Sequence, residues 1–262
     1  MKSDCCYTID FSKSENDNNE LFAHLRETLI TDGYVKVKCD NIPDDDFNKI
    51  CLDMIKGVGG IGCPYGKDPE GIVWPVKVLA LDSDAESKHL PGTNVDRELH
   101  FHTDCSYEHN APDYIGLFVV QYDRSKQGGK FQLVQTKEVI DQLSPMTKQL
   151  LRDEKYKIIV RPAYRKDDQD CIWGPIILSN ERMRYQPDLI DKDQLQQERL
   201  EKRLAIDELN SIIFNDNKLN IFRPFLDNHM MILFNNHQFL HGRTKIEDID
   251  RHLLRVRFNL HD

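Results

Sequence analysis

The chain has 262 residues and a formal net charge of −9 at pH 7, and this length is enough to bury one full hydrophobic core. Nucleic-acid backbones and anionic membrane surfaces bind basic patches, so the acidic balance argues against both as the main partner. We therefore expect a site for a small-molecule substrate, in a monomer or a homo-oligomer. No linker rich in Pro, Gly or Ser divides the sequence, so residues 1–262 are expected to form a single domain.

Neither a membrane span nor a secretory signal is expected. No apolar run approaches the roughly 20 residues that cross a bilayer, and residues 1–10 lack the apolar core of a signal peptide. The seven cysteines are odd in number and scattered, and none forms a CxxC pair, a pattern typical of reduced thiols rather than of a disulfide framework or a zinc ribbon. We therefore expect a cytoplasmic protein.

The N-terminal region is expected to contain two helices with a strand between them. Apolar residues recur at helical spacing over residues 21–29 and stop at Gly33, after which the sequence alternates like a strand. Pro43 and three acidic residues precede a second helix, whose apolar positions share one face and which ends at Gly57.

Beyond residue 57 the helical period gives way to short apolar runs rich in β-branched and aromatic residues, which favour strands. One further long helix is expected at about residues 192–214, with a densely charged solvated face. Many short strands with few helices predict a sandwich or jelly roll with helices outside, rather than a parallel βαβ sheet. The expected strands are residues 76–81, 114–122, 131–134, 157–160, 172–178, 230–234 and 253–258.

Residues 57–62 fit the GxGxxG pattern of dinucleotide-binding proteins, and Asp82 follows at about the spacing of the acidic ribose ligand. That pattern must follow a strand and open a helix, whereas here a helix precedes it and Pro64 continues the loop. We therefore interpret it as a flexible glycine loop, at most bordering a pocket.

His102 and Asp104 form the strongest candidate for a metal site. On a strand, residues two apart project to the same face, so an imidazole and a carboxylate can hold one ion together. HxD triplets also arise by chance, and the alternative is a surface histidine near an aspartate. A third ligand is available in His241, which follows the apolar run at residues 230–234. Two histidines and one carboxylate compose the facial triad of non-haem iron oxygenases, which leaves iron positions open.

Two other histidines compete for the role of metal ligand. His100 shares strand parity with His102, and His237 stands four residues before His241. A fourth protein ligand would close a coordination position that the chemistry needs. We therefore expect both to lie beside the site or in the core.

Arg251 and Arg255, with Arg257 at the same parity, fall in the otherwise apolar last strand. A strand arginine usually marks a solvated edge. The apolar neighbours favour a role in binding an anion, because a dicarboxylate needs a fork-shaped cation. Residues four apart on a strand are separated by roughly 13 Å, so the two guanidinium groups are expected to serve different anions or to converge only through their long side chains.

These residues resemble the taurine dioxygenase and clavaminate synthase-like family of 2-oxoglutarate oxygenases, and the length suits its smaller members, such as carbapenem synthase. The resemblance rests on LHFHTDCSYEHNAPDYIGLFVVQ from residue 99, on the GG at residues 128–129, and on NNHQFLHGRTKIEDIDRHLLRVRF from residue 235. It implies an α+β fold with a double-stranded β-helix (jelly roll) core and flanking helices. The N-terminal helices, at about residues 19–56, would pack on the jelly roll, and a helical insert would occupy about residues 136–215.

The resemblance also assigns roles to individual residues. Fe(II) would be held by His102, Asp104 and His241, with 2-oxoglutarate and O2 as co-substrates. Arg251 would bind the C5 carboxylate of 2-oxoglutarate, and Arg255 would face the substrate or the co-substrate. Family members often carry Thr or Ser just after the GG, where this chain has Lys130-Phe131-Gln132. Gln132 is the candidate replacement for that contact, with Thr136 as a second choice.

The implied activity is oxidation, foremost hydroxylation, of an unactivated C–H bond in a small carboxylate-bearing molecule such as an amino acid or a derived metabolite. Asp104 supplies the carboxylate that related halogenases lack, which favours hydroxylation over chlorination, while desaturation and ring formation stay open. Two alternatives remain. Zinc accepts the same ligand set, so a zinc-dependent hydrolase on a jelly roll is one. A catalytically inactive small-molecule binding protein is the other.

Overall fold

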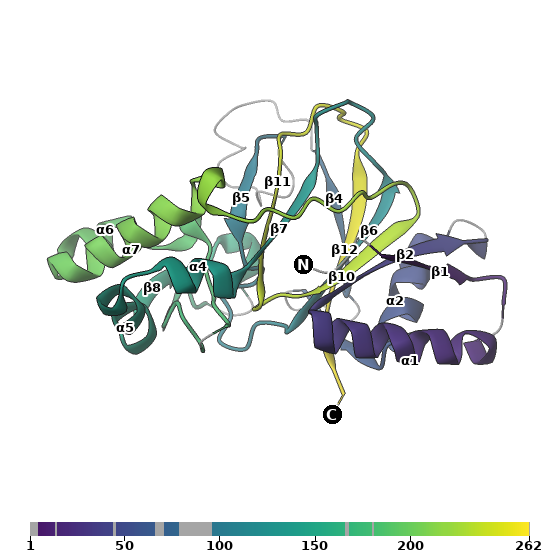
Figure 1. Cartoon of the computed structure of the whole chain (residues 1–262), viewed down its shortest axis with the longest axis horizontal. Helices are drawn as coiled ribbons and strands as arrows, with labels where there is room; N and C mark the ends of the chain where they lie inside the picture. The colour runs from purple at the N-terminus through teal and green to yellow at the C-terminus, as the bar shows by residue number, and fades with distance from the viewer. Residues whose placement is uncertain are drawn as a thin grey trace.

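The computed structural model describes residues 5–13, 15–43, 46–65, 71–78, 96–165, 168–179 and 181–261. Its strands form two main sheets and a separate hairpin (Figure 1). The large sheet contains β1 (Cys6–Asp10), β2 (Tyr34–Asp40), β10 (Met230–Asn235), β6 (Tyr114–Gln121), β12 (His252–Leu260) and β3 (Gly60–Gly62) in that order, with β4 (Val73–Lys77) also paired to β12. The small sheet has the order β5 (Leu99–His102), β11 (Phe239–Arg243), β7 (Phe131–Gln135), and the hairpin joins β8 (Tyr156–Ile159) to β9 (Cys171–Gly174).

The two main sheets pack face to face around an apolar interior. Ile115 on β6 and Phe234 on β10 meet Leu133 on β7, and none of the three is exposed to solvent. Neighbouring strands of the small sheet are antiparallel, as are β2, β10, β6 and β12 of the large one. The expected α+β fold with a jelly-roll core and flanking helices is confirmed.

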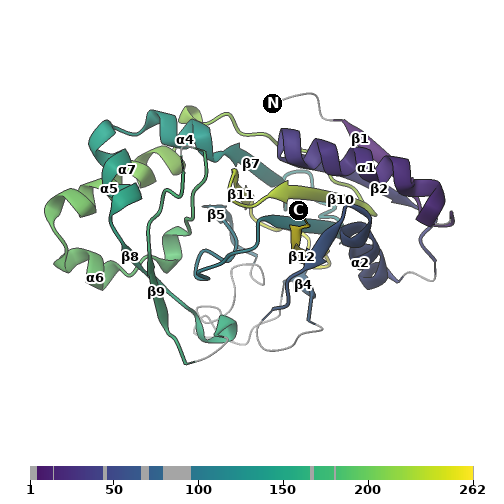
Figure 2. The same cartoon turned by 90° about the horizontal axis from the view of Figure 1, so that it is seen from below.

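Helices α1 (Glu15–Asp32) and α2 (Phe47–Gly57) cover the outer face of the large sheet. Both views place them on the opposite side of the strands from the remaining helices (Figures 1 and 2). α1 ends at Gly33, whose φ of +79° suits glycine, and a Cβ there would lie 2.7 Å from the ring of Phe239. Asp46 caps α2 by accepting the N–H of Lys49. The other two acidic residues expected before this helix, at positions 44 and 45, lie outside the described residues.

The segment between β7 and β10 holds most of the other helices and the β8–β9 hairpin. The single helix expected at residues 192–214 is in fact two helices, because Arg199 has extended backbone angles and starts a new one. The first of them fully buries no side chain and packs on the core only through the partly buried Leu195, whereas the second buries Leu209, Ile212 and Ile213. The helices are α4 (Thr136–Gln142), α5 (Pro145–Asp153), α6 (Lys192–Gln197) and α7 (Leu200–Ile213), with 3₁₀ turns η3 (Pro162–Tyr164), η4 (Pro187–Leu189) and η5 (Asp216–Lys218).

Other boundaries also differ from the sequence expectation. β4 starts three residues earlier than expected, and residues 79–81 of that expected strand lie outside the described residues. β9 stops at Gly174 rather than at residue 178, because Pro175 has no N–H to donate to a ladder. β1, β3 and β11 were not expected, and β5 was expected only as the strand that would carry His102.

The glycine-rich stretch follows α2 as expected, but it is not a loop throughout. Its last three residues form β3, which pairs with β12. Asp82, the other part of the dinucleotide pattern, lies outside the described residues. Among the described helices, none combines the length and the apolar character needed to cross a membrane.

Candidate active site

The small sheet brings the three expected metal ligands together. His102 is the last residue of β5 and lies directly opposite His241 on β11. The Nε2 atoms of these histidines are 3.5 and 3.7 Å from Oδ1 of Asp104. All three side chains are buried, and one ligand atom from each lies within 4.8 Å of the others. No other group of His, Cys, Asp and Glu with this geometry occurs among the described residues.

Asp104 reaches this cluster from a turn, and the expectation that it lies on a strand with His102 is wrong. The turn is fixed by Asn236, which is fully buried. The backbone N–H of Asp104 donates to Oδ1 of Asn236 at 2.8 Å, and Nδ2 of Asn236 donates back to the Asp104 carbonyl at 2.9 Å. Cys105 follows with a φ of +56°. Sequence reasoning missed Asn236; its one local signal was a pair of asparagines directly after an apolar strand.

The protonation states of the cluster suit a divalent metal ion. Nδ1 of His102 lies 2.8 Å from the carbonyl of His100, so a proton on Nδ1 leaves the Nε2 lone pair directed at the cluster. Burial, followed by the neighbouring His102, lowers the pKa of His241 to about 3 and keeps it neutral. Burial opposes ionisation of Asp104, but Arg255, the hydrogen bond with His102 and the nearby His241 together outweigh it and hold the pKa of that carboxyl well below its usual range. A neutral His241, an ionised Asp104 and the Nε2 of His102 directed at the cluster fit Fe(II).

The two competing histidines lie outside the cluster. His100 is exposed, and the edge of its ring packs on Phe214 with centroids 5.1 Å apart. His237 is buried, and its Nε2 lies 3.4 Å from the carbonyl of Ala111 and 3.7 Å from Oδ1 of Asp113. The ring of each histidine therefore contacts residues other than the three metal ligands.

Arg255 is buried directly beside the metal ligands. Its Nη1 donates to both carboxylate oxygens of Asp104, at 3.1 and 3.0 Å, and its Nε donates to the hydroxyl of Tyr65 at 3.0 Å. Arg257, two residues on, donates to Glu108 and to Sγ of Cys105 and lies over the ring of Tyr65. These two arginines therefore brace the turn that carries Asp104.

A small pocket opens onto the cluster. Two of its walls are Tyr107 and Tyr164, whose rings stack with centroids 4.8 Å apart. The remaining lining residues are Leu99, His102, Asp104, Cys105, Gln186 and Arg255. The pocket thus combines the metal ligands with a cation and with groups that can donate and accept hydrogen bonds.

Arg251 faces a different and larger cavity, of about 380 Å³, which it lines together with Phe131 and Leu253. The side chain is buried, and Nη1 has no hydrogen-bond partner in the part of the chain that the structure describes. Burial, followed by the neighbouring Arg243, lowers the pKa of Arg251 below the ordinary value for arginine. The guanidinium groups of Arg251 and Arg255 therefore meet different surroundings. Only Arg255 lies on β12; Arg251, which was expected on the same strand, is the residue just before it.

Comparison with known proteins fits this geometry. A family model described as "Taurine catabolism dioxygenase TauD, TfdA family" matches residues 2–257. The chain belongs to this family. As a TauD-family member it is a non-haem iron dioxygenase that uses 2-oxoglutarate and O2. A comparison with curated protein sequences finds no match.

Solved structures share the fold of this TauD-family chain at low sequence identity. An asparagine oxygenase in complex with Fe(II), 3-hydroxyasparagine and succinate is 16% identical, with a TM-score of 0.70 over 94% of this chain and 79% of its own. The non-haem iron oxygenase OrfP in complex with Fe and alpha-ketoglutaric acid is 16% identical, with a TM-score of 0.66 over 97% of this chain and 94% of its own. A mutant of OrfP in complex with (3S)-hydroxy-L-Arg is 17% identical, with a TM-score of 0.67 over 97% of this chain and 94% of its own.

The candidates for the contact after the GG are engaged elsewhere. With its amide turned so that both groups are satisfied, Oε1 of Gln132 accepts from Nε and Nη2 of Arg223 at 3.0 and 3.1 Å. The hydroxyl of Thr136 donates to the carbonyls of Glu181 and His237. Phe131, not Gln132, lines the cavity at Arg251. A direct contact between Gln132 and 2-oxoglutarate therefore stays a prediction.

The second glycine of the GG lets Arg251 pack closely. Gly129 has a φ of +58°, and a Cβ on it would lie 2.8 Å from Cβ of Asp123 and 2.9 Å from Cδ of Arg251. The Arg251 backbone N–H donates to the carbonyl of Asp248 at 3.0 Å. The β6–β7 and β11–β12 loops therefore jointly position Arg251.

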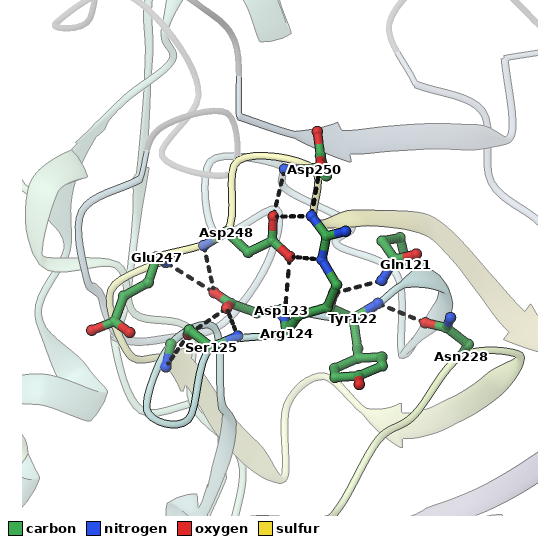
Figure 3. Close-up of polar contacts among 10 residues, drawn as sticks. Gln121, Tyr122, Asp123, Arg124, Ser125, Asn228, Glu247, Asp248 and Asp250 are labelled. Atoms are coloured by element: carbon green, nitrogen blue, oxygen red, sulfur yellow. Dashed lines mark hydrogen bonds and ion pairs between the residues drawn. The ribbon is translucent and has the colours of Figure 1, made fainter.

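Figure 3 shows how these two loops are joined. Arg124 of the β6–β7 loop pairs with Asp248 and Asp250 of the β11–β12 loop. The carboxylate of the neighbouring Asp123 accepts the backbone N–H groups of Glu247 and Asp248. One exposed and one buried contact thus tie the loops together.

Proposed function

We propose that this dioxygenase hydroxylates an unactivated C–H bond of an amino acid, or of an amino-acid-derived metabolite, that carries a carboxylate. The observation that carries the proposal is the position of Arg255, a buried cation that lines the small pocket beside the three metal ligands. Two neighbours in the fold comparison support it, because one holds 3-hydroxyasparagine and another holds hydroxy-L-Arg.

In this proposal His102, Asp104 and His241 hold the iron, and Arg251 binds the far carboxylate of 2-oxoglutarate. When bound, the iron and 2-oxoglutarate activate O2 for attack on the C–H bond. The neutral state of His241 leaves its imidazole available to a metal. Arg255 keeps Asp104 ionised and fixes the direction of its carboxylate, which supports a ligand role for that residue.

The pocket walls supply groups that can orient an amino acid. Arg255 donates to Tyr65 and Asp104 through Nε and Nη1, which leaves the charged Nη2 to donate to a substrate carboxylate. Gln186, Tyr107 and Tyr164 bring an amide and two phenol hydroxyls to the same pocket. We assign the substrate carboxylate to Arg255 and the remaining polar groups of the substrate to these three side chains.

The proposal treats residues 1–262 as a single cytoplasmic oxygenase domain. The N-terminal helices, expected at about residues 19–56, correspond to α1 and α2 on the large sheet. The insert expected at about residues 136–215 corresponds to the segment with α4–α7, in which the β8–β9 hairpin adds strands.

Anaerobic addition of Fe(II) and 2-oxoglutarate to the full chain tests the proposal. A weak metal-to-ligand charge-transfer absorption in the visible is expected, and it is not expected of a zinc hydrolase or an inactive binding protein. A panel of amino acids is then screened for succinate release above the rate without substrate. The matched control is His241→Ala, which should give neither signal. If the wild-type chain gives no absorption, the proposed function is wrong.

A further inference from the structure

The cavity at Arg251 and the small pocket at the metal ligands are separate spaces. No residue lines both of them. The inner end of the cavity nevertheless lies close to the metal ligands, because the ring of Phe131, which lines it, is 6.1 Å from that of His241. Leu253, also on its wall, stands two residues from Arg255 on β12. A molecule in this cavity would therefore approach the metal site from a side that the small pocket does not use.

Cations dominate the wall and the outer rim of this cavity. Arg223, Lys126 and Lys130 line it and are exposed, whereas Arg251 is buried deeper. Asp123 is the one carboxylate among the described lining residues, and its oxygens accept hydrogen bonds from the backbone and hydroxyl groups of nearby loop residues. In a chain of net charge −9, these side chains form a local patch of positive charge. Behind it lies Nη1 of the buried Arg251, which has no hydrogen-bond partner among the described residues.

The rim is held in place by the contacts in Figure 3. The β6–β7 loop contributes Lys126 and Lys130 to the rim, and Arg251 is the last residue of the β11–β12 loop. Arg124 and Asp123 join these loops. The two lysines and Arg251 therefore lie on two loops that ion pairs and hydrogen bonds hold together.

We propose that the dicarboxylate co-substrate enters, and its dicarboxylate product leaves, through this cationic cavity, on a route separate from the pocket of the primary substrate. The inference rests on the proposed function, because it takes 2-oxoglutarate as the dianion that Arg251 binds. Clefts lined by one sign of charge raise association rates of the opposite charge by about 10- to 1,000-fold. The positive charges of Arg223, Lys126 and Lys130 at the rim offset the electrostatic repulsion between this acidic chain and a dianion.

Association kinetics test the route. Anaerobic stopped-flow mixing of the Fe(II)-loaded chain with 2-oxoglutarate follows the charge-transfer absorption, which reports binding and not turnover. The rim variant is Lys126→Glu with Lys130→Glu. The control is Lys137→Glu with Lys218→Glu, which makes the same charge change at two exposed lysines that do not line the cavity. A second ligand, 2-oxopentanoate, keeps the chelating end of 2-oxoglutarate but lacks its far carboxylate.

The rim variant should bind 2-oxoglutarate about tenfold more slowly at low salt, with the dissociation rate changed less than about twofold. High salt should erase most of the difference. The control should stay within about twofold of wild type, and 2-oxopentanoate should be slowed less than 2-oxoglutarate. Equal slowing of the rim and control variants, or an unchanged association rate in both, would overturn the inference. Absence of the absorption in wild type would instead reject the proposed function itself.

Discussion

Arg251 and Arg255 lie four residues apart in the sequence and at the same parity, yet they differ in what surrounds them. Arg255 donates to both oxygens of Asp104 and to Tyr65. Arg251 is equally buried, but its Nη1 has no hydrogen-bond partner among the described residues and it lines a cavity. Arg255 supports the metal ligand Asp104, and only its remaining nitrogen, Nη2, is left for a substrate carboxylate. A buried cation facing a cavity instead is arranged for an anion from outside.

The largest expected effect is at the metal ligands themselves. Asp104→Ala or His241→Ala should abolish succinate formation from 2-oxoglutarate while the fold largely survives, because a facial triad with one ligand missing binds iron poorly. Iron stoichiometry and succinate release are the measurements, with circular dichroism to check the fold. Near-normal turnover in both variants at limiting iron would remove these residues from the site.

The next effect separates the two arginines by stability in the metal-free chain. Arg255→Met leaves the Asp104 carboxylate buried without its cation, which should lower the free energy of unfolding by about 3–5 kcal/mol. Arg251→Met removes a desolvated cation whose Nη1 lacks a partner among the described residues, so stability should stay level or rise. Mn(II) should reduce the Arg255→Met deficit, because a divalent ion supplies positive charge beside Asp104.

Denaturant unfolding with and without Mn(II) gives these values. The proposed difference between the two arginines is wrong if both substitutions lower the free energy of unfolding equally in the metal-free chain. It is also wrong if Mn(II) does not reduce the loss in unfolding free energy that Arg255→Met causes.

A third prediction concerns ligand binding. A desolvated charged pair is worth about 2–5 kcal/mol when one partner is truncated, so Arg251→Ala should raise the apparent constant for 2-oxoglutarate about thirtyfold or more. Arg251→Lys should recover only part of this, because a point charge cannot reproduce the fork. At saturating iron, Arg255→Ala should raise the apparent constant for the primary substrate more than that for 2-oxoglutarate. Both constants are measured for both variants, and a larger loss of 2-oxoglutarate binding in Arg255→Ala would reverse the assignment.

The metal cluster could be predicted from sequence because its residues occur in short motifs. His102 and Asp104 are two apart, and His241 and Arg251 fall in one continuous stretch near the C-terminus. The strand that carries His241 was missed, however, and the strand that carries His102 was expected only from the metal-site argument. β5 and β11 read LHFH and FLHGR. LHFH does alternate apolar and polar residues, but stretches of four and five residues are too short for periodicity to identify a strand.

The contacts that orient the cluster could not be predicted, because they join distant parts of the chain. Asn236 holds the Asp104 turn from 132 residues away, and Tyr65 meets Arg255 across 190 residues. Neither contact joins residues that are close enough in the sequence to form a recognisable motif. The different surroundings of Arg251 and Arg255 follow from such contacts. Their spacing in the sequence left open whether they serve different anions or converge through their side chains, and it did not say which arginine would be paired.

The smallest expected effect comes from the loop contacts in Figure 3 that hold Arg251. Arg124 is exposed and pairs with Asp248 and Asp250. Exposed ion pairs contribute about 1 kcal/mol or less, so Arg124→Gln should change 2-oxoglutarate affinity less than about threefold, and salt should reduce even that. Asp123 is buried, and its carboxylate accepts N–H groups from both loops. Asp123→Asn places an amide N–H₂ where acceptors are needed. It should therefore weaken 2-oxoglutarate binding more than Arg124→Gln does, by about 1–3 kcal/mol. Titrations of both variants at low and high salt decide it: if Arg124→Gln weakens 2-oxoglutarate binding as much as Asp123→Asn does, the exposed contact and not the buried one holds Arg251.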